Sequence, residues 1–252
     1  MTINEEITNA NIGGVIGKLE AASLHNCENS GKLLFDEKFL IKQTCNIGGV
    51  VAYAAQGTKE IHDCVNSGSI TYLGTCEFAG ADAATGNANM ILGGVVGITW
   101  SESVLNCSNQ ASAVLDIAGK VSGNNKVEVG IDLVTRTAIA GVIGARAGKK
   151  SQLSSVTNDV VTENCSNGGN VRFSWNYLGA GYIFSSGCIG IFDSDIAKAC
   201  NNDGSVTIKA RVDSDINDDS DTNTNTLYLG GLFGCIYSSC DQIENCKNNG
   251  SV

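Results

Sequence analysis

Two short motifs alternate six times along the chain, and this repetition restricts the fold more than any other feature of the sequence. The paired-glycine motif opens each repeat, as GGVIG (13–17), GGVVA (48–52), GGVVG (93–97), AGVIG (140–144), SGCIG (186–190) and GGLFG (230–234). The cysteine–asparagine motif follows, as NCENSGKL (26–33), DCVNSGSI (63–70), NCSNQASA (106–113), NCSNGGNV (164–171), ACNNDGSV (199–206) and NCKNNGSV (245–252). The second glycines, Gly14, Gly49, Gly94, Gly141, Gly187 and Gly231, are 35, 45, 47, 46 and 44 residues apart, a spacing typical of solenoids and propellers.

The cysteine–asparagine motif has a physical interpretation at each position. Its spacing, Cys-x-Asn-x-Gly-x-Val, predicts a strand, a turn with glycine at positive φ and asparagine tolerating left-handed geometry, and a second strand. Ala111 replaces the glycine in the third copy, which Ala113 closes. If equivalent corners stack about 4.8 Å apart, each asparagine amide can bond to its copies above and below. The asparagines of this expected stack are Asn29, Asn66, Asn109, Asn167, Asn202 and Asn248.

The paired-glycine motifs are short, apolar and without alternation, so we interpret them as buried strands. Together the motifs predict an all-β fold: a parallel, right-handed β-solenoid (β-helix) of about six repeats, forming one domain over residues 1–252. Loop insertions at 74–89, 116–137, 145–161 and 207–226 account for the uneven spacing. A six-bladed β-propeller is the alternative. The pattern stops in mid-repeat, which favours an open stack and a fragment of a longer secreted protein.

Composition and missing motifs argue against several classes of function. The net charge of −10 is unlike that of nucleic-acid-binding proteins, which concentrate lysine and arginine. No apolar run approaches the roughly 20 residues that span a bilayer, and the start lacks the features of a signal peptide. The sequence contains no nucleophile elbow, phosphate loop or Cys-x-x-Cys pair. We therefore expect no enzyme activity, no cofactor and no nucleic-acid partner.

Six of the 11 cysteines occupy one motif position: Cys27, Cys64, Cys107, Cys165, Cys200 and Cys246. Because cysteine behaves as a small hydrophobic residue, we expect them to form a stack of buried thiols. Disulfides between neighbouring repeats are the alternative, although parallel Cβ vectors make their dihedral angle awkward. Cys235 and Cys240, five residues apart, are the best candidates for a local disulfide.

The only two histidines, His25 and His62, share a motif position one repeat apart. Such a pair could bind a metal ion or serve as an acid–base site. The other copies carry leucine, glutamate and lysine at this position, and no carboxylate is obviously bound to the pair. We therefore favour two exposed residues in a variable column.

The acidic segment 213–226 resembles a calcium-binding loop at first sight. Asp213, Asp215 and Asn217 follow its 1-3-5 ligand spacing, and Asp219 is a further candidate ligand. Position 6 is not glycine and position 12 is not glutamate, so a solvated loop is favoured over a weak calcium site.

Two aromatic residues are candidates for glycan contact. Trp175 and Tyr177 alternate in the run FSWNYLG, so they face the same side of a strand. Half-buried aromatic residues at the edges of the repeats are the simpler interpretation.

The pairing of GGVVG with NCSNxGxV about a dozen residues later resembles the GLUG-type repeats of bacterial surface and secreted proteins, adhesin-like proteins among them. The resemblance covers nearly the whole chain and implies an extracellular, cell-surface or secreted β-solenoid. It suggests a non-catalytic surface module, adhesin-like or a stalk presenting binding loops. A carbohydrate- or calcium-binding accessory domain of a secreted enzyme is the alternative. The expected partner is a host or cell-surface glycan or protein. A second copy of the chain, associated end to end, is a further expected partner.

Overall fold

The computed structural model describes residues 6–78, 89–123, 137–147, 159–178, 182–212, 226–237 and 240–252. All regular elements in these ranges are β-strands, and the all-β prediction is therefore confirmed. No helix within these ranges is long and apolar enough to cross a membrane.

Three sheets contain one strand from each of the six repeats. The strands after the paired glycines are β2 (Ile16–Leu19), β7 (Val51–Ala54), β13 (Val96–Thr99), β19 (Ile143–Ala147), β24 (Ile189–Asp193) and β29 (Phe233–Ile236). The strands before the cysteine are β3 (Leu24–His25), β8 (Glu60–His62), β14 (Ser103–Leu105), β20 (Val161–Glu163), β25 (Ile196–Lys198) and β30 (Gln242–Glu244). The strands that contain the asparagine are β4 (Glu28–Asn29), β9 (Val65–Asn66), β15 (Ser108–Asn109), β21 (Ser166–Asn167), β26 (Asn201–Asn202) and β31 (Lys247–Asn248).

A fourth sheet of 13 strands combines the strands on either side of these three. Its strands before the paired glycines are β1 (Glu6–Gly13), β6 (Leu40–Gly48), β12 (Asn89–Gly93), β18 (Thr137–Ala140), β23 (Tyr182–Ser186) and β28 (Thr226–Gly230). Its strands after the asparagine corner are β5 (Leu33–Phe35), β10 (Ile70–Tyr72), β16 (Val114–Ile117), β22 (Asn170–Leu178) and β27 (Val206–Val212). The remaining two, β11 (Thr75–Phe78) and β17 (Lys120–Gly123), connect the two groups through β6 and β22.

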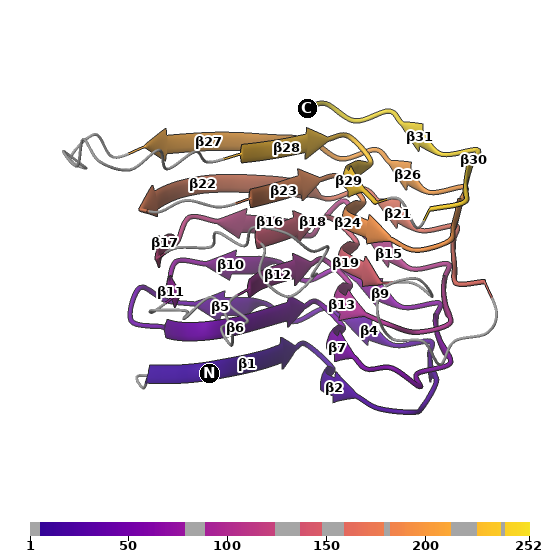
Figure 1. Cartoon of the computed structure of the whole chain (residues 1–252), viewed down its shortest axis with the longest axis horizontal. Helices are drawn as coiled ribbons and strands as arrows, with labels where there is room; N and C mark the ends of the chain where they lie inside the picture. The colour runs from indigo at the N-terminus through magenta and orange to yellow at the C-terminus, as the bar shows by residue number, and fades with distance from the viewer. Residues whose placement is uncertain are drawn as a thin grey trace.

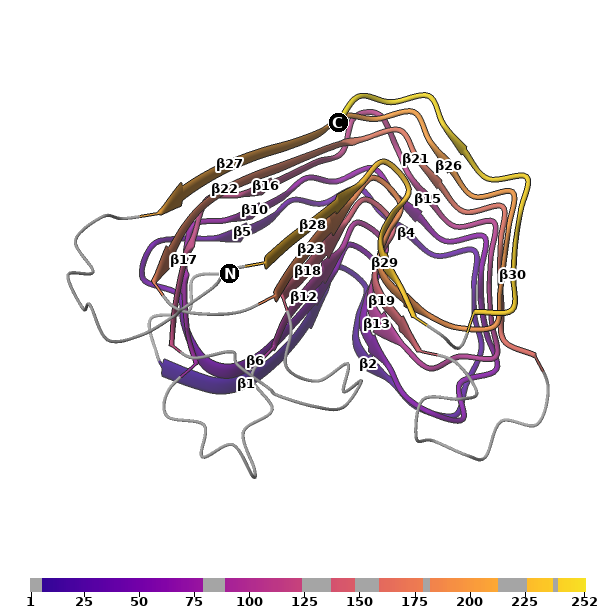
Figure 2. The same cartoon turned by 45° about the horizontal axis from the view of Figure 1, so that its top comes forward.

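Neighbouring repeats pair in parallel through equivalent residues. Asn29 aligns with Asn66, and Gly48 aligns with Gly93. Successive repeats therefore lie one on another, from β1 at one end of the stack to β28–β31 at the other (Figure 1; Figure 2). Stacked parallel sheets are the arrangement expected of a parallel β-solenoid, whereas propeller blades are separate four-stranded antiparallel sheets.

The paired-glycine motif, which we interpreted as one buried strand, contains the end of one strand, a corner and the start of the next strand. In the second repeat β6 ends at Gly48 and β7 begins at Val51, with a bend at Gly49 and Val50. A Cβ on Gly49 would lie 1.9 Å from the carbonyl oxygen of Gly94 in the next repeat. The corner therefore requires glycine because the backbones of neighbouring repeats approach too closely for a side chain.

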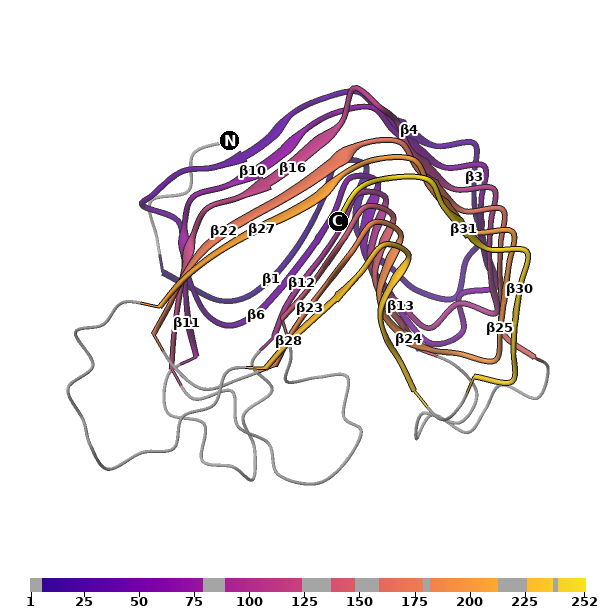
Figure 3. The same ribbon diagram turned by 90° about the horizontal axis from the view of Figure 1, so that it is seen from above.

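Viewed along the stack, every repeat follows the same bent path (Figure 3). One core cluster, which includes Ile47 and Tyr72, packs strands before the paired glycines against strands after the asparagine corner. A second, which includes Val96 and Cys107, fills the space between the other three sheets. The corner that carries the asparagines thus closes the second core.

Candidate functional site

The six motif asparagines lie in one row, one on each of β4, β9, β15, β21, β26 and β31. In the first five, Nδ2 donates to the Oδ1 of the asparagine in the next repeat. The Nδ2–Oδ1 distances are 2.8 Å for Asn29–Asn66, 2.8 Å for Asn66–Asn109, 2.9 Å for Asn109–Asn167, 2.8 Å for Asn167–Asn202 and 2.7 Å for Asn202–Asn248. We call this row the amide ladder. The ladder has a direction, because all five bonds are donated towards the C-terminal end of the stack.

The glycines of both motifs make room for the amide ladder. A Cβ on Gly94 would lie 2.6 Å from Cγ of Asn109, and one on Gly68 would lie 3.0 Å from Nδ2 of Asn29 and 1.9 Å from the carbonyl oxygen of Gly31. The expectation that the corner glycine has a positive φ was wrong: Gly57 is the one glycine with positive φ in the described part of the chain. Close approach between repeats explains the corner glycine instead.

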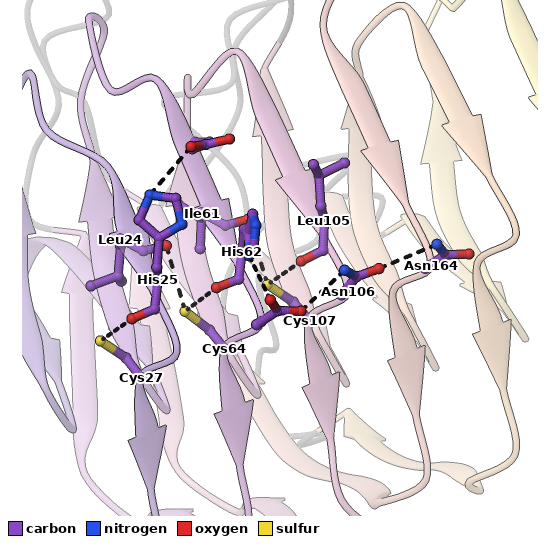
Figure 4. A network of polar contacts seen from close by, with 12 residues as sticks. Leu24, His25, Cys27, Ile61, His62, Cys64, Leu105, Asn106, Cys107 and Asn164 are labelled. Atoms are coloured by element: carbon purple, nitrogen blue, oxygen red, sulfur yellow. Dashed lines mark hydrogen bonds and ion pairs between the residues drawn. The ribbon is translucent and has the colours of Figure 1, made fainter.

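A left-handed residue recurs in every repeat directly before the cysteine, a position that the sequence interpretation missed. The φ angles are 52° for Asn26, 55° for Asp63, 52° for Asn106, 54° for Asn164, 49° for Ala199 and 54° for Asn245. Asparagine and aspartate tolerate this region best among residues with a Cβ. Some of these side chains also join neighbouring repeats on the outer surface, with Asn106 Nδ2 donating to Asp63 Oδ1 at 3.0 Å and Asn164 Nδ2 to Asn106 Oδ1 at 3.2 Å (Figure 4).

The third copy of the cysteine–asparagine motif departs from the others by a two-residue insertion. Leu115, and not Ala113, pairs with both Ile70 and Val171, the closing residues of the flanking copies. Ala113 is therefore in the position of the corner glycine, and it is buried. Ala111 belongs to an exposed turn that returns through the Ala113 N–H to Gln110 O hydrogen bond of 2.9 Å. The interpretation of Ala111 as a replaced glycine was thus wrong.

The six motif cysteines also form a column, buried in the four inner repeats and half-buried at Cys27 and Cys246. Their thiols contact backbone carbonyl oxygens, for example Cys107 Sγ with Leu105 O at 3.4 Å (Figure 4). A hydrogen bond with Cys165 lowers the pKa of Cys107, while a hydrogen bond with Cys64 and burial raise that pKa, to about 12 overall. Since the thiolate is the reactive form, the Cys107 thiol is suited to packing and not to nucleophilic chemistry.

Cys188, from the fifth paired-glycine motif, joins the same interior, with its Sγ 3.7 Å from the carbonyl oxygen of Cys165. No disulfide joins Cys235 to Cys240, both of which are in the described part of the chain. The described residues contain no group of three or more histidine, cysteine or acidic side chains arranged to hold a metal ion.

The two histidines lie side by side on the outer surface of the first two repeats. Their ring centroids are 4.7 Å apart, with an angle of 76° between the ring planes. The statement that no carboxylate accompanies them was wrong: Glu60 Oε1 lies 3.2 Å from His25 Nε2, and Asp63 Oδ2 lies 2.8 Å from His62 Nδ1 (Figure 4). The second contact is an ion-pair distance without hydrogen-bond alignment. The four side chains thus form one group of titratable residues on the surface of the first two repeats.

A buried polar group in the second core was not predicted from the sequence. Arg146 is fully buried on β19, where Nε donates to Thr162 Oγ1 at 3.1 Å and Nη1 donates to Ala147 O at 3.2 Å. Burial lowers the pKa of Arg146 to about 9, against the opposing effects of Cys165 and Asp195, so the guanidinium remains charged at neutral pH. Asp195 is also buried and accepts a hydrogen bond of 2.9 Å from the Val160 N–H. Both groups also contact the preceding repeat, Asp195 through Val160 and Arg146 through Nη2, which donates to Glu102 O at 3.4 Å.

For the remaining predicted site residues the structure describes the backbone alone or nothing. The calcium candidates Asp213, Asp215, Asn217 and Asp219 lie outside the described residues. Trp175 and Tyr177 lie on β22, where their backbones align with Ala210 and Val212 of β27, while their side chains are outside the described part of the chain. The glycan and calcium hypotheses therefore stay predictions.

Comparisons with known proteins identify no relative of the chain. None of the family models compared with the chain matches it, and the curated proteins and solved structures give no match either. The resemblance to GLUG-type repeats therefore rests on the motifs alone.

Proposed function

We propose that the chain is a non-catalytic repeat module, a right-handed β-solenoid domain that acts as a stalk and presents its inserted segments to binding partners. The observation that carries this proposal is the amide ladder, in which one side chain from every repeat joins the next without a break. The residues that recur are thus occupied in holding the repeats together. The segments that vary between repeats are the ones available for recognition.

The location and partner class follow from the sequence resemblance. GLUG-type repeats occur in bacterial surface and secreted proteins, so we place the module outside the cell and assign it a host or cell-surface glycan or protein as its partner. Buried thiols are compatible with this location, because burial keeps them from oxidants as well as from other thiols.

The test asks whether the inserted segments are needed for binding and whether the stacked repeats fold without them. Variants in which residues 79–88, 124–136 or 213–225 are replaced by short Gly-Ser linkers are applied to arrays of glycans and extracellular matrix proteins, with and without calcium. We expect each variant to keep the unfolding midpoint of the parent chain within a few degrees, and one of them to lose binding. Unfolding of all three variants would contradict the separation between scaffold and insertions.

The same arrays separate the alternative function. Binding abolished by Trp175→Ala, or dependent on calcium and on residues 213–225, would favour a carbohydrate- or calcium-binding accessory domain. Turnover of an arrayed glycan by the chain would contradict a non-catalytic module.

A further inference from the structure

His25 and His62 lie on the outer surface of the first two repeats, where the parallel pairing of β3 with β8 aligns them residue to residue (Figure 4). Their side chains are 37% and 32% exposed, so both rings are open to solvent. The positions that continue this column are Leu105, Glu163, Lys198 and Glu244. The stacking of the first repeat on the second thus brings together two imidazoles, and the chain contains no others.

Each imidazole has a carboxylate beside one of its two ring nitrogens. Glu60 Oε1 lies 3.2 Å from Nε2 of His25, and Asp63 Oδ2 lies 2.8 Å from Nδ1 of His62. A negative charge favours the proton on the nitrogen beside it, so each neutral ring keeps its lone pair on the other nitrogen. Histidines that bind metal ions are arranged in this way, with a carboxylate behind the ring that fixes its tautomer and its orientation.

The carboxylate of Asp63 is itself held by the next repeat. Asn106 Nδ2 donates to Asp63 Oδ1 at 3.0 Å, while Oδ2 is the oxygen that lies beside His62 (Figure 4). Asn106 Oδ1 in turn accepts from Asn164 Nδ2 at 3.2 Å. The ring of His62 is therefore positioned by a row of polar side chains that continues along the outer surface of the stack.

The spacing of the two rings fits a metal ion held between them. Two zinc–nitrogen bonds of about 2.0–2.1 Å at a tetrahedral angle hold their nitrogens about 3.4 Å apart. The ring centroids are 4.7 Å apart, and the facing edges of two rings can lie closer together than their centroids. Rotation of the side chains can therefore bring Nδ1 of His25 and Nε2 of His62 to this separation while the aligned backbones stay in place.

From these observations we propose that His25 and His62 form a binding site for a divalent ion of zinc, copper or nickel, with Glu60 and Asp63 as positioning residues. Imidazole nitrogen suits these metals, whereas calcium and magnesium prefer oxygen ligands. The described residues contain no group of three side chains arranged to bind a metal ion, so water completes the coordination of the ion. The ion joins the first repeat to the second, and the site is independent of what the inserted segments bind.

Titration of the untagged chain with Zn²⁺ in excess Mg²⁺ tests the site by nuclear magnetic resonance. With nitrogen-15 in the histidines, the long-range proton–nitrogen spectrum contains the rings of His25 and His62 alone. We expect the signals of His25 Nδ1 and His62 Nε2 to change along one binding curve, while the nitrogens beside the carboxylates keep their protons. Changes in one ring only, or in neither, would overturn the proposal.

Replacement of one histidine tests whether the two rings share the ion. His62→Leu introduces the residue that the next repeat has at this position, so the fold should tolerate it, and circular dichroism verifies that it does. At Zn²⁺ concentrations that saturate the parent chain, the signals of His25 should no longer change. Binding to His25 that is as tight as in the parent chain would show that the rings act separately, and it would contradict a shared ion.

The positioning role of the carboxylates has its own variants. Glu60→Gln and Asp63→Asn should each weaken Zn²⁺ binding by about 10- to 100-fold. In the metal-free chain Glu60→Gln should also move the proton of His25 partly from Nε2 to Nδ1, which a merely structural change would not do. Glu163→Gln makes the same change in charge at the histidine position of the fourth repeat and should leave binding unchanged. Carboxylate variants that bind Zn²⁺ as tightly as Glu163→Gln does would refute this role.

Discussion

Replacement of Asn109 by alanine tests whether the amide ladder holds the repeats together. Asn109 is 1% exposed, accepts a hydrogen bond from Asn66 at 2.8 Å and donates one to Asn167 at 2.9 Å. Alanine removes both bonds, each of which contributes about 1 kcal/mol net. It also leaves the Asn66 and Asn167 amides in the interior without one partner each, which costs about 1 kcal/mol or more. We expect the free energy of unfolding to fall by about 2–4 kcal/mol.

Urea denaturation followed by far-ultraviolet circular dichroism measures this change. Gln110→Ala is the matched control, because Gln110 is the next residue and is exposed. Asn248→Ala removes one ladder bond at an exposed position, so it should cost about 1 kcal/mol or less. If Asn109→Ala destabilises the chain no more than these two variants do, the ladder is a consequence of the fold and contributes little to its stability.

Because Asn109 both accepts and donates a ladder bond, Asn109→Asp is a second test of the same contacts. A carboxylate at this position can accept from Asn66 but cannot donate to Asn167, so burial and the facing oxygen raise the pKa of the introduced carboxyl group in the folded state. The unfolded value is about 3.9. A raised folded pKa means that the variant is most stable below the unfolded pKa and loses stability as the pH rises through the folded pKa. A pH-independent difference between Asn109→Asp and the parent chain would contradict a buried position 109 whose side chain must donate as well as accept.

The packing between repeats is open to three more tests. Gly94→Ala should prevent folding or lower the unfolding midpoint severely in thermal melts, because the new Cβ would lie 1.9 Å from a backbone oxygen, whereas Gly31→Ala, with 3.4 Å to its nearest neighbour, should be tolerated. In the folded chain a thiol reagent followed by peptide mass spectrometry should label half-buried Cys27 well before buried Cys107, and equal rates would contradict the buried column. Arg146→Ala should destabilise the chain by about 3 kcal/mol in urea titrations, because it leaves hydrogen-bond acceptors and the nearby Asp195 charge without a cation, and a loss below about 1 kcal/mol would show that the buried charge is dispensable.

The positions of the strands in the repeat could be predicted from the sequence because their requirements recur in every copy. Six copies of Cys-x-Asn fix the register, and a register error of one residue would turn the thiols out of the core. The same comparison contains a signal for the left-handed corner, since asparagine or aspartate precedes the cysteine in five copies. The quoted motif contains this position, but the interpretation of its spacing, Cys-x-Asn-x-Gly-x-Val, begins at the cysteine.

Features confined to one repeat could not be predicted from recurrence. Arg146 aligns with Thr99 and Phe192, so nothing in its column indicates a buried charge. The carboxylates beside the histidines are a different case. Glu60 lies two residues before His62 on β8, and it meets His25 only because neighbouring repeats are stacked. Such pairs become predictable once the register is known.

The two extra residues after Asn109 indicate how this fold accommodates variation. Asn109 keeps its ladder contacts on both sides, and β16 regains the register with β10 and β22 from Leu115 onwards. The extra length leaves the stack as an exposed turn, so the insertion does not shift the parallel pairing. Repeats of 35 to 47 residues can therefore share one ladder, because the amide contacts fix each corner separately and leave the chain length between corners unconstrained. Selection for new binding segments can then act on the insertions without altering the contacts between repeats.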